Sequence, residues 1–337
     1  MKYFHVKGCI KVSPKITVLL TVYNRESISK TIESILSQTY QDFELLIIDN
    51  ASTDKTQSII KSYSDKRIRL YINEKNMGQT YSLNRGLALA RGEYIARIDA
   101  DDICLPKRLE IQADFLDKNP EFGFCGSWVR YITDNDILTV TMKMPTSDTS
   151  LRAMQVFACG MYHPSAMYRK SIVKSNNITY DSNIVISEDY ELWRKLLIYS
   201  KGLNIPQILI YYRKGDNDSV KHADLMFKEA LEIRRKIYIR DFSENNFLLS
   251  NLLKVLDIEY KHTKTLVETI FLIKVLKKAC FYKYNTRIMN DKILRFHFFM
   301  HVYTATIFYN SAAWARFINY IYKKVKISFY KIKGRKK

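Results

Sequence analysis

The chain has 337 residues, enough for two domains or for one large domain with an extension. Hydrophobic residues make up 47% and charged residues 26% of it, which excludes a wholly disordered or collagen-like chain. Its 54 lysines and arginines exceed its 34 aspartates and glutamates, and the net charge of +20 indicates a polyanionic partner: nucleic acid, an anionic membrane face or a phosphorylated substrate. Residues 221–337 hold 25 of the basic and 9 of the acidic residues, so the positive charge is concentrated there.

The cysteines and the first apolar run bear on the compartment. The five cysteines form no CxxC pair, which argues against structural zinc and a disulfide framework and favours a reducing cytosol. The first apolar run, Ile16–Tyr23, ends at Asn24 without a small-residue cleavage site, so we expect no signal peptide. We therefore expect a cytoplasmic protein.

The first hundred residues alternate two kinds of segment. Apolar runs predict four strands: Ile16–Val22, Phe43–Ile48, Ile68–Ile72 and Tyr94–Ile98. Apolar residues at helical spacing predict three helices: Ser27–Gln38, Thr53–Tyr63 and Tyr81–Ala90. Continuous apolar strands that alternate with helices indicate an α/β fold with a central, mostly parallel sheet covered on both faces. Ligands of such sheets bind beyond the carboxyl ends of the strands, so the residues that follow each strand are candidates for a site.

The pattern is less regular after Pro106. We expect these elements: a helix over Lys107–Asp117, strands up to Tyr131, loops over Thr133–Ser150, a helix over Glu188–Tyr199 and a strand at Ile208–Tyr212. From about Asp224 the chain becomes helical and cationic. We therefore expect a first domain at residues 14–215 and a helical, cationic C-terminal region at residues 222–337.

Three carboxylates follow the fourth predicted strand, in Asp99-Ala100-Asp101-Asp102. So many carboxylates in four residues repel one another unless a cation neutralises them. A hard divalent cation, Mn²⁺ or Mg²⁺, takes oxygen ligands and borrows the rest from a substrate diphosphate. A solvated acidic turn is the alternative, but the position at the carboxyl end of a strand favours a cation site.

Polar residues also follow the first two strands. Tyr23 has a ring that can stack on a nucleobase, and Thr21 can hydrogen-bond to that base, although an ordinary strand-end aromatic is the alternative. Asp49 can accept a hydrogen bond from a base N–H or a ribose hydroxyl. Asp54, farther along the same segment, is better read as a helix cap.

The order of these motifs resembles glycosyltransferase family 2, whose members have the GT-A fold, a Rossmann-like sheet flanked by helices. The matching segments are Thr21–Asn24, Asp49–Asp54, Asn76-x-Gly78, Asn84-x-Gly86, Ala90–Tyr94 and Asp99–Asp102. Three later segments match the second half of that family's domain, in its bacterial polysaccharide branch: His163–Ser165, Glu188–Trp193 and Tyr211–Arg213. The resemblance covers residues 14–215, and it is the ordered set, not any single motif, that is specific.

The resemblance implies a role for each matched residue at the strand ends. The residues implied to bind the nucleotide of the donor, usually a uridine nucleotide, are Thr21, Tyr23, Asn24, Asp49, Asn76, Asp99 and Ala100. The resemblance also implies that Asp101 binds a divalent cation bridging the diphosphate, with Asp99 beside it and Asp102 as a third member.

In the second half, the resemblance implies that Asp189 is the general base. A base on the acceptor hydroxyl and a cation on the leaving diphosphate favour in-line displacement with inversion. Glu188 would be repelled if it faced the same pocket. Trp193 either stacks on the acceptor sugar or belongs to the core, and His163 either contacts the cation or a phosphate or is structural. Arg213 contacts the pyrophosphate, orients Asp189, or packs.

One position departs from the family pattern. Many relatives carry an arginine where this chain has Leu83. Any contact of that arginine with a phosphate or a base is therefore absent here, or is supplied by a neighbour such as Arg85 or Arg97.

The resemblance thus implies an inverting, metal-dependent transfer of a sugar from a nucleotide sugar to a saccharide acceptor. A UDP-sugar is the favoured donor. The acceptor would be a growing, lipid-linked bacterial surface polysaccharide, such as O-antigen, capsule or lipooligosaccharide. A sugar-1-phosphate nucleotidyltransferase is one alternative, but it needs a Gly-rich basic loop after the first strand, where this chain has Thr21–Arg25. A non-enzymatic protein that binds anionic membranes or nucleic acid is another, but it leaves the acidic strand ends unexplained. We expect no nucleic-acid partner.

The end of the chain suggests a membrane surface. Eleven basic residues and no acidic one follow Asp291, and twenty residues between Arg295 and Arg316 lack a formal charge. His297 and His301 make this stretch a poor spanning segment. We expect an amphipathic region that lies on the anionic inner face of the cytoplasmic membrane, with a helical lid and a basic tail as the alternative.

Overall fold

The computed structural model describes residues 13–214, 223–260, 266–284, 291–292 and 297–298. The chain divides into two compact units: Met1–Asp148 with Met161–Ala223, and Thr149–Gly160 with Asp224–Lys337. The segment Thr149–Gly160 therefore belongs with the C-terminal helices, although it lies in the middle of the sequence. All of the candidate site residues lie in the first unit.

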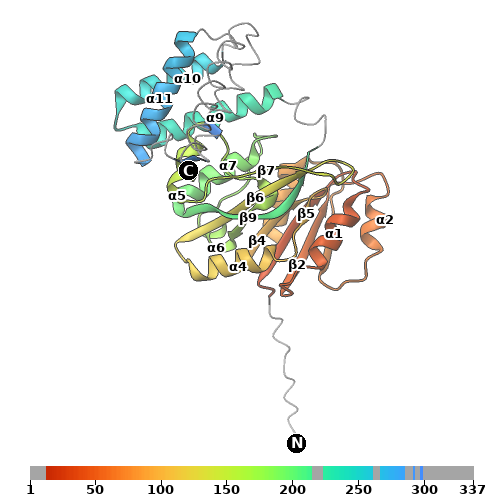
Figure 1. Ribbon diagram of the computed structural model, residues 1–337. Coiled ribbons are helices and arrows are strands. Elements are labelled where there is room, and N and C mark those ends of the chain that lie inside the picture. Colours follow the sequence, from red (N-terminus) through yellow and green to blue (C-terminus); the bar gives the residue numbers. More distant parts are fainter. Residues whose placement is uncertain (1–12, 215–222, 261–265, 285–290, 293–296, 299–337) are drawn as a thin grey trace, which may run out of the picture. The chain divides into compact units, whose positions relative to one another are not determined.

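The described part of the first unit is built on a nine-stranded sheet (Figure 1). Its strands are β1 (Ile16–Val22), β2 (Phe43–Asp49), β3 (Ile68–Ile72), β4 (Tyr94–Asp99), β5 (Ile103–Cys104), β6 (Phe122–Ile132), β7 (Leu138–Met142), β8 (Met167–Arg169) and β9 (Lys201–Arg213). Their order is β3-β2-β1-β4-β8-β6-β9-β5, and β7 pairs with β6 off this path. The first four strands are parallel, and β8 joins β4 to β6 through antiparallel pairs.

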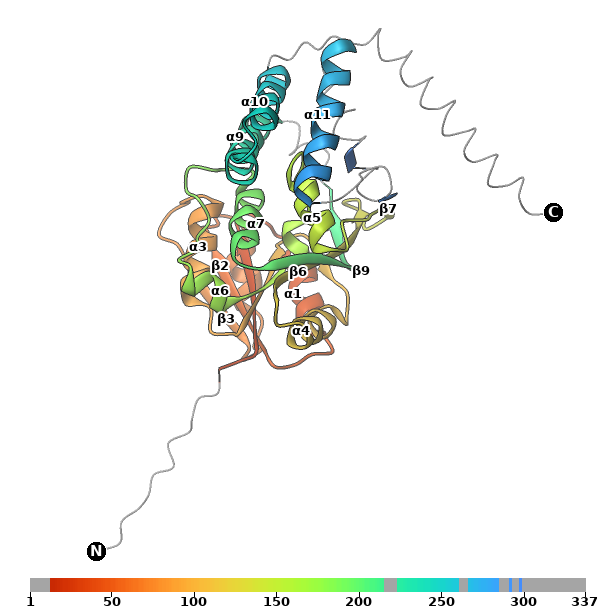
Figure 2. The ribbon, with the colours of Figure 1, turned by 90° about the vertical axis from the view of Figure 1, so that its left-hand side faces the viewer.

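Helices cover both faces of this sheet. They are α1 (Ile28–Leu36), α2 (Thr56–Lys61), α3 (Gln79–Leu89), α4 (Arg108–Lys118), α6 (Lys170–Ser175) and α7 (Glu188–Tyr199), with a 3₁₀ turn, η1, at His163–Ser165. Figure 2 shows α1 and α4 on one side and α3 and α6 on the other. Alternate residues of a strand point to opposite faces, so Val18 and Leu20 join the core under α1 and α4, while Leu19 packs against Gly86 of α3. The predicted α/β fold is confirmed, and the sheet is mixed because the second half of the chain adds antiparallel strands.

The second unit is helical in its described residues, as predicted for the chain beyond Asp224. Its helices are α5 (Asp148–Gln155), which starts on the last residue of the first unit, α9 (Ala223–Phe242), α10 (Asn246–Tyr260) and α11 (Leu266–Tyr284). The Tyr238 hydroxyl donates to the carbonyl oxygen of Val156 at 2.8 Å, and this bond fastens Thr149–Gly160 to α9. No helix within the described ranges is long and apolar enough to cross a membrane. Apart from His297 and Phe298, the uncharged stretch and the basic residues that follow it lie outside the described residues.

Several elements differ from the sequence prediction: β5, β8, α5 and α6 were not predicted, and three further differences have a clear cause. The strand β9 begins at Lys201, seven residues before the predicted start, because it pairs with β6 over the whole length of that strand. The predicted loop after Thr133 contains β7, a short strand that pairs with β6 alone. Helix α2 starts only at Thr56, whose backbone N–H donates to Asp54 at 2.9 Å.

The side chain of Trp193 contributes to the packing of this core. It is completely buried and stacks on Phe124, with ring centroids 5.6 Å apart. We expect Trp193→Ala to lower the free energy of unfolding by about 3–5 kcal/mol, since it leaves a large cavity. Urea denaturation measures this loss, and Ile198→Ala, on the exposed side of the same helix, is the control. Equal and small losses in both variants would contradict the core assignment.

Candidate functional site

The carboxyl ends of β1, β2 and β4 bring three of the predicted motifs together. Strand β1 lies between the other two, and the register pairs Thr21 with Asp99 and Val22 with Asp49. The side chains of these motifs are therefore carried by neighbouring strands at one edge of the sheet. This edge is the place where parallel α/β sheets bind ligands.

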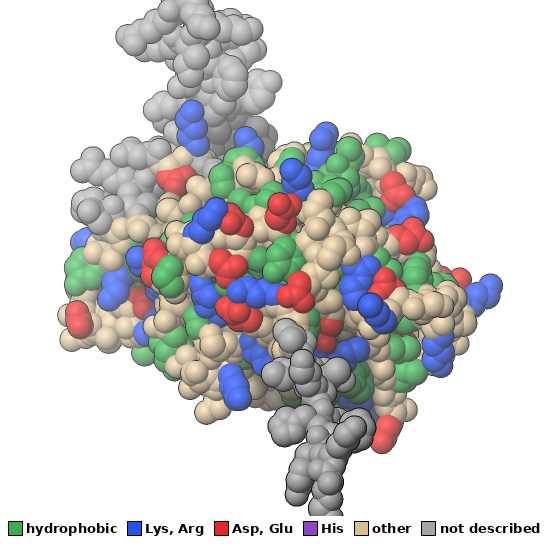
Figure 3. All heavy atoms as spheres, turned by 90° about the horizontal axis from the view of Figure 1, so that it is seen from below, with side chains coloured by type: hydrophobic (Ala, Val, Ile, Leu, Met, Phe, Trp, Pro, Cys, Tyr) green, Lys and Arg blue, Asp and Glu red, His purple; other side chains and the backbone are tan. Residues whose placement is uncertain are grey.

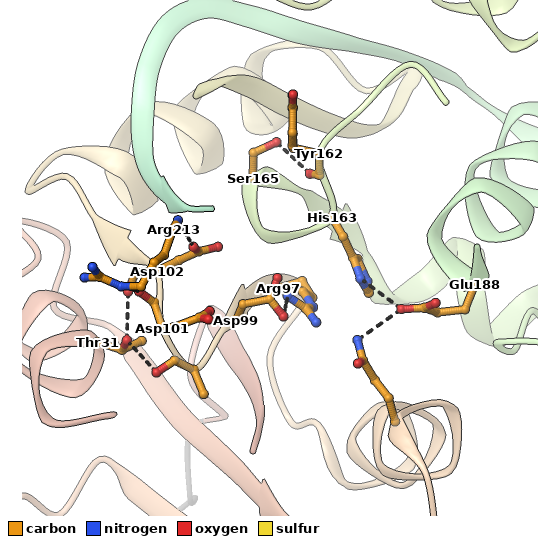
Figure 4. A network of polar contacts seen from close by, with 12 residues as sticks. Thr31, Arg97, Asp99, Asp101, Asp102, Tyr162, His163, Ser165, Glu188 and Arg213 are labelled. Atoms are coloured by element: carbon orange, nitrogen blue, oxygen red, sulfur yellow. Dashed lines mark hydrogen bonds and ion pairs between the residues drawn. The ribbon is translucent and has the colours of Figure 1, made fainter. Parts of the chain in front are cut away.

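Asp99 and Asp101 are the more accessible carboxylates of the acidic loop after β4, which is drawn in Figure 4. The carboxylate of Asp99 is 32% exposed and pairs with the buried guanidinium of Arg97. The carboxylate of Asp101 is 22% exposed, and its Oδ2 lies 3.3 Å from Nη2 of Arg25. Burial and then the charge of Asp99 raise the pKa of Asp101, while Arg25 lowers it. Because the charge of Asp99 still acts on Asp101, a further cation at this loop would be stabilising.

Asp102 has a different environment. Its carboxyl is completely buried, and Oδ1 accepts a hydrogen bond of 2.7 Å from the backbone N–H of Arg213. Burial, followed by the charges of Asp99 and Asp101, holds the pKa of Asp102 well above its usual range. The hydroxyl of Thr31 donates to the Asp102 carbonyl oxygen at 2.8 Å. Asp102 therefore fixes the acidic loop to the end of β9 and to α1.

Arg213 completes this attachment. Its Nε donates to the carbonyl oxygen of Asp101 at 3.0 Å, and its guanidinium also contacts the carbonyl oxygen of Thr133 and the carboxylate of Asp136. The side chain is 7% exposed. Because of these contacts, Arg213 holds the acidic loop in place and does not face an open pocket.

The loop fits a cation that is shared with a substrate. Among the described residues, no group of three or more His, Cys, Asp or Glu side chains has the arrangement of a metal site. Asp99 and Asp101 are the two accessible carboxylates of the loop, whereas Asp102 is buried and hydrogen-bonded. Mg²⁺ is often held by one or two carboxylates plus substrate phosphates, so two accessible carboxylates match that mode of binding.

The end of β2 supplies a buried acceptor. Asp49 is completely buried, and its Oδ1 accepts the backbone N–H of Ser52 at 2.6 Å, while Oδ2 has no hydrogen-bond partner. A buried carboxylate oxygen without a donor is unfavourable unless a ligand supplies one. Tyr23, at the end of the neighbouring strand, is 46% exposed, and Thr21 is partly exposed. An aromatic ring and a carboxylate at adjacent strand ends suit a nucleobase.

Asn24, Asn76 and Ala100 shape the loops at this edge. Asn24 has a positive φ of 47°. Its backbone N–H donates to the Ser52 hydroxyl at 2.9 Å, and its side-chain oxygen accepts the Thr53 N–H at 2.8 Å. The side-chain oxygen of Asn76 accepts from Asn50 at 2.7 Å and from the backbone N–H of Gly78 at 3.0 Å. The carbonyl oxygen of Ala100 accepts the hydroxyl of Thr31 at 3.0 Å. Asn24 and Asn76 thus contact the loop after β2, and Ala100 contacts α1.

A second polar group lies at the start of α7. Glu188 is 5% exposed, and its Oε1 accepts from Gln79 at 3.0 Å and lies 3.7 Å from Nδ1 of His163. Burial and then the charge of Asp189 raise the pKa of Glu188 to about 8, so it is largely protonated at neutral pH. Burial, followed by the charge of Arg97, holds the pKa of His163 well below its usual range. Glu188 and His163 are therefore an uncharged pair at neutral pH.

The candidate residues of the second half are placed in different ways. Asp189 is partly exposed, in the first turn of α7. His163 is buried and hydrogen-bonded through Nε2 to the Tyr180 hydroxyl at 2.9 Å. Arg97 lies between the acidic loop and the His163–Glu188 pair (Figure 4). Trp193 belongs to the core, and its burial leaves no ring face for an acceptor sugar.

The two proposed substitutes for the missing family arginine are already engaged. Leu83 itself is completely buried. Arg97 is buried on Asp99, and Arg85 donates to the carbonyl oxygen of Ile72 at 2.9 Å and to the side chain of Asn73. Neither guanidinium is therefore exposed toward the acidic loop.

Sequence reasoning missed several residues near the site. Gln79 and Arg25 contact Glu188 and Asp101, and nothing in the periodicity of the sequence marks either one. Tyr131 and Tyr162 share a hydrogen bond of 2.6 Å between their hydroxyls, and both rings pack on Tyr212. These tyrosines are far apart in sequence, and only the pairing of β6 with β9 brings two of them together.

At the amino ends of the strands, opposite the candidate site, the surface carries both basic and acidic side chains. On the face seen from below, lysine and arginine side chains are interspersed with acidic ones (Figure 3). A shallow cleft of about 450 Å³ there is lined by Lys15, Arg91, Glu93 and Lys170, among others. Lys15 is paired with Glu93 and Asp117, each at 2.9 Å, so much of its charge is neutralised. This cleft lies at the amino ends of the strands and holds none of the predicted site residues.

A helix-covered sheet with an acidic loop after β4 has the architecture of GT-A glycosyltransferases. The model of the family "Glycosyl transferase family 2" matches residues 17–176. An uncharacterized glycosyltransferase of Methanocaldococcus jannaschii is 34% identical over 213 residues, which are 61% of this chain and 73% of the relative. The chain therefore belongs to glycosyltransferase family 2, and the protein is a glycosyltransferase.

Two further relatives come from Escherichia coli. The O-antigen biosynthesis glycosyltransferase WbnJ is 29% identical, with 71% of this chain and 94% of the relative covered. The UDP-Glc:alpha-D-GlcNAc-diphosphoundecaprenol beta-1,3-glucosyltransferase WfaP is 30% identical, with 59% and 76% covered. The family thus includes relatives of this chain that act in polysaccharide biosynthesis.

Solved structures have the same fold. S. aureus TarS 1–349 in complex with UDP-GlcNAc has a TM-score of 0.58 at 19% identity, over 79% of this chain and 81% of that one. The mannosyltransferase PcManGT from Pyrobaculum calidifontis, in complex with GDP-Man and Mn²⁺, has a TM-score of 0.56 at 16% identity, over 88% and 86%. The predicted GT-A fold is confirmed by these likenesses.

The raised pKa of Glu188 predicts a pH dependence of stability. The folded protein retains a proton on Glu188 between its ordinary pKa of 4.5 and about 8, and the unfolded chain releases it. Stability therefore falls as the pH rises through this window. Glu188→Gln cannot ionise, so we expect its stability relative to the unmodified protein to increase from pH 5 to pH 8. Urea denaturation of both proteins across this range measures the difference, and a pH-independent difference would contradict the assignment.

Proposed function

We propose that the protein transfers a sugar from a nucleotide sugar, a UDP-sugar, to a saccharide acceptor in bacterial surface polysaccharide synthesis, with inversion and with the help of a divalent cation. The observation that carries the donor assignment is the buried Oδ2 of Asp49, which lacks a donor at the edge where Tyr23 is exposed. The N3–H of uracil is a donor of the right kind, and the ring of Tyr23 can stack on the same base. The UDP-GlcNAc complex of TarS and the name of WfaP support a UDP-sugar.

The accessible carboxylates of the acidic loop would hold the divalent cation. Asp101 and Asp99 are proposed ligands, while Asp102 holds the loop in shape. The cation, Mn²⁺ or Mg²⁺, neutralises negative charge on the departing diphosphate when bound. The family and the Mn²⁺ complex of PcManGT support the use of a divalent cation.

Asp189 is the proposed general base. It is the accessible carboxylate of α7, whereas Glu188 is buried and largely protonated at neutral pH, which disfavours it as a proton acceptor. A base that removes the acceptor proton while the diphosphate departs on the opposite side of the sugar gives inversion. Glu188, held by Gln79 and beside His163, then positions the first turn of α7.

The proposed acceptor is based on a relative, and the proposed cellular location is based on the positive charge of the C-terminal region. The name of WfaP describes a diphosphoundecaprenol acceptor, and we propose a lipid-linked glycan for this protein as well. The cationic region at residues 222–337 would hold the catalytic domain, residues 14–215, at the inner face of the cytoplasmic membrane.

Asp101→Asn tests the role of the cation. Because the variant removes a charged ligand, we expect UDP binding in the presence of Mn²⁺ to be lost while the fold is retained. Isothermal titration calorimetry with and without Mn²⁺ measures the binding. Asp114→Asn, at an exposed carboxylate of α4, is the matched control. Unchanged Mn²⁺-dependent binding in Asp101→Asn would exclude this ligand.

Asp189→Asn tests the base. A positioned base contributes about 10²–10⁴-fold to the rate, so we expect kcat to fall by that factor while UDP binding is unchanged. Transfer to a saccharide acceptor and nucleotide binding are measured on the same preparation. Normal turnover would mean that another residue accepts the proton.

A further inference from the structure

In the part of the chain that the structure describes, four arginines lie near the acidic loop and its neighbouring strand ends, and three of them are buried or bonded to the protein. Arg97 is 1% exposed and pairs with Asp99. Arg85 donates to the Ile72 carbonyl oxygen and to Asn73. Arg213 is 7% exposed, and it donates hydrogen bonds to the carbonyl oxygens of Asp101 and Thr133 and to the carboxylate of Asp136.

Arg25 is different from these three. Its side chain is 42% exposed, and its guanidinium contacts the Oδ2 of Asp101 at 3.3 Å. Its main chain is fixed, because its backbone N–H donates to the hydroxyl of Thr56 at 2.8 Å. Among the described residues, Asp101 is the carboxylate that this guanidinium contacts. An exposed guanidinium on a fixed backbone can turn to another anion without unfolding any element.

We propose that Arg25 binds the diphosphate of the donor, and that in the absence of donor and cation it neutralises Asp101. The inference rests on the proposed function, since it takes the donor to be a nucleotide diphosphate sugar and Asp101 to be a cation ligand. Arg25 then makes the phosphate contact that the buried, apolar side chain of Leu83 cannot make. The guanidinium presents paired N–H donors in a planar fork that matches phosphate oxygens.

The exchange follows from the charges. A divalent cation on Asp101 repels the guanidinium that now contacts the same carboxylate, so Arg25 and the cation compete when no nucleotide is present. A diphosphate bound to that cation lies beside the displaced guanidinium and attracts it. Arg25 therefore weakens the binding of the cation alone and strengthens the binding of cation and diphosphate together.

The test uses Arg25→Gln and Arg25→Lys in the full chain, with Arg91→Gln as the control, since Arg91 is an exposed arginine at the opposite edge of the sheet. Calorimetry measures three affinities for each protein: UDP with Mn²⁺, uridine, and Mn²⁺ alone. For Arg25→Gln we expect UDP binding to weaken about tenfold to hundredfold, the loss of charge-assisted hydrogen bonds, with uridine binding unchanged. We expect Mn²⁺ alone to bind more tightly than to the unmodified protein.

The conservative variant separates this role from a structural one. Arg25→Lys keeps the charge but not the fork, so its UDP affinity should lie between those of the other two proteins. Equal UDP affinity in Arg25→Gln and the unmodified protein would overturn the inference while leaving the proposed donor intact. A parallel loss of uridine binding would also overturn it, because it would indicate a distorted nucleoside site. If the unmodified protein failed to bind UDP with Mn²⁺, the proposed function itself would fail and the inference with it.

Discussion

The mutual repulsion of three aspartates within four residues is the constraint around which this catalytic unit is organised. Each carboxylate is handled in a different way. Asp99 faces a buried guanidinium, Asp101 faces a half-exposed one, and Asp102 is withdrawn from water onto a backbone N–H. The negative charge that remains accessible is thereby limited to two side chains at the carboxyl edge of the sheet, where a substrate with its own cation can meet them.

The fold could be predicted from the sequence because it depends on local patterns, and the same patterns bring the residues of the candidate site to one edge of the sheet. The strands β1, β2 and β4 are largely apolar runs, and each ends at a polar motif, so the pattern predicts both the sheet and the edge that carries the candidate site. The strand β9 was predicted too short and β7 was not predicted at all. Both depend on pairing with β6, a contact between distant segments that local periodicity does not record.

The roles of single residues were harder to predict, for a physical reason. Whether a carboxylate binds a ligand or holds a loop depends on its burial and on its partners, and residue type reveals neither. Asp101 and Asp102 are adjacent in sequence, yet one is accessible and the other is enclosed by Arg213. The same applies to Glu188 and Asp189, and to Arg25, whose importance becomes visible only through its distance from Asp101.

The acidic loop is attached to the protein through its own main chain. Thr31 donates to two of its carbonyl oxygens, and Arg213 donates to a third and to the carboxyl of Asp102. These hydrogen bonds by themselves hold the main chain of the loop in place. The loop is therefore ordered before a ligand binds. The entropic cost of ordering it is part of the free energy of folding, so little of the binding free energy is lost to conformational change.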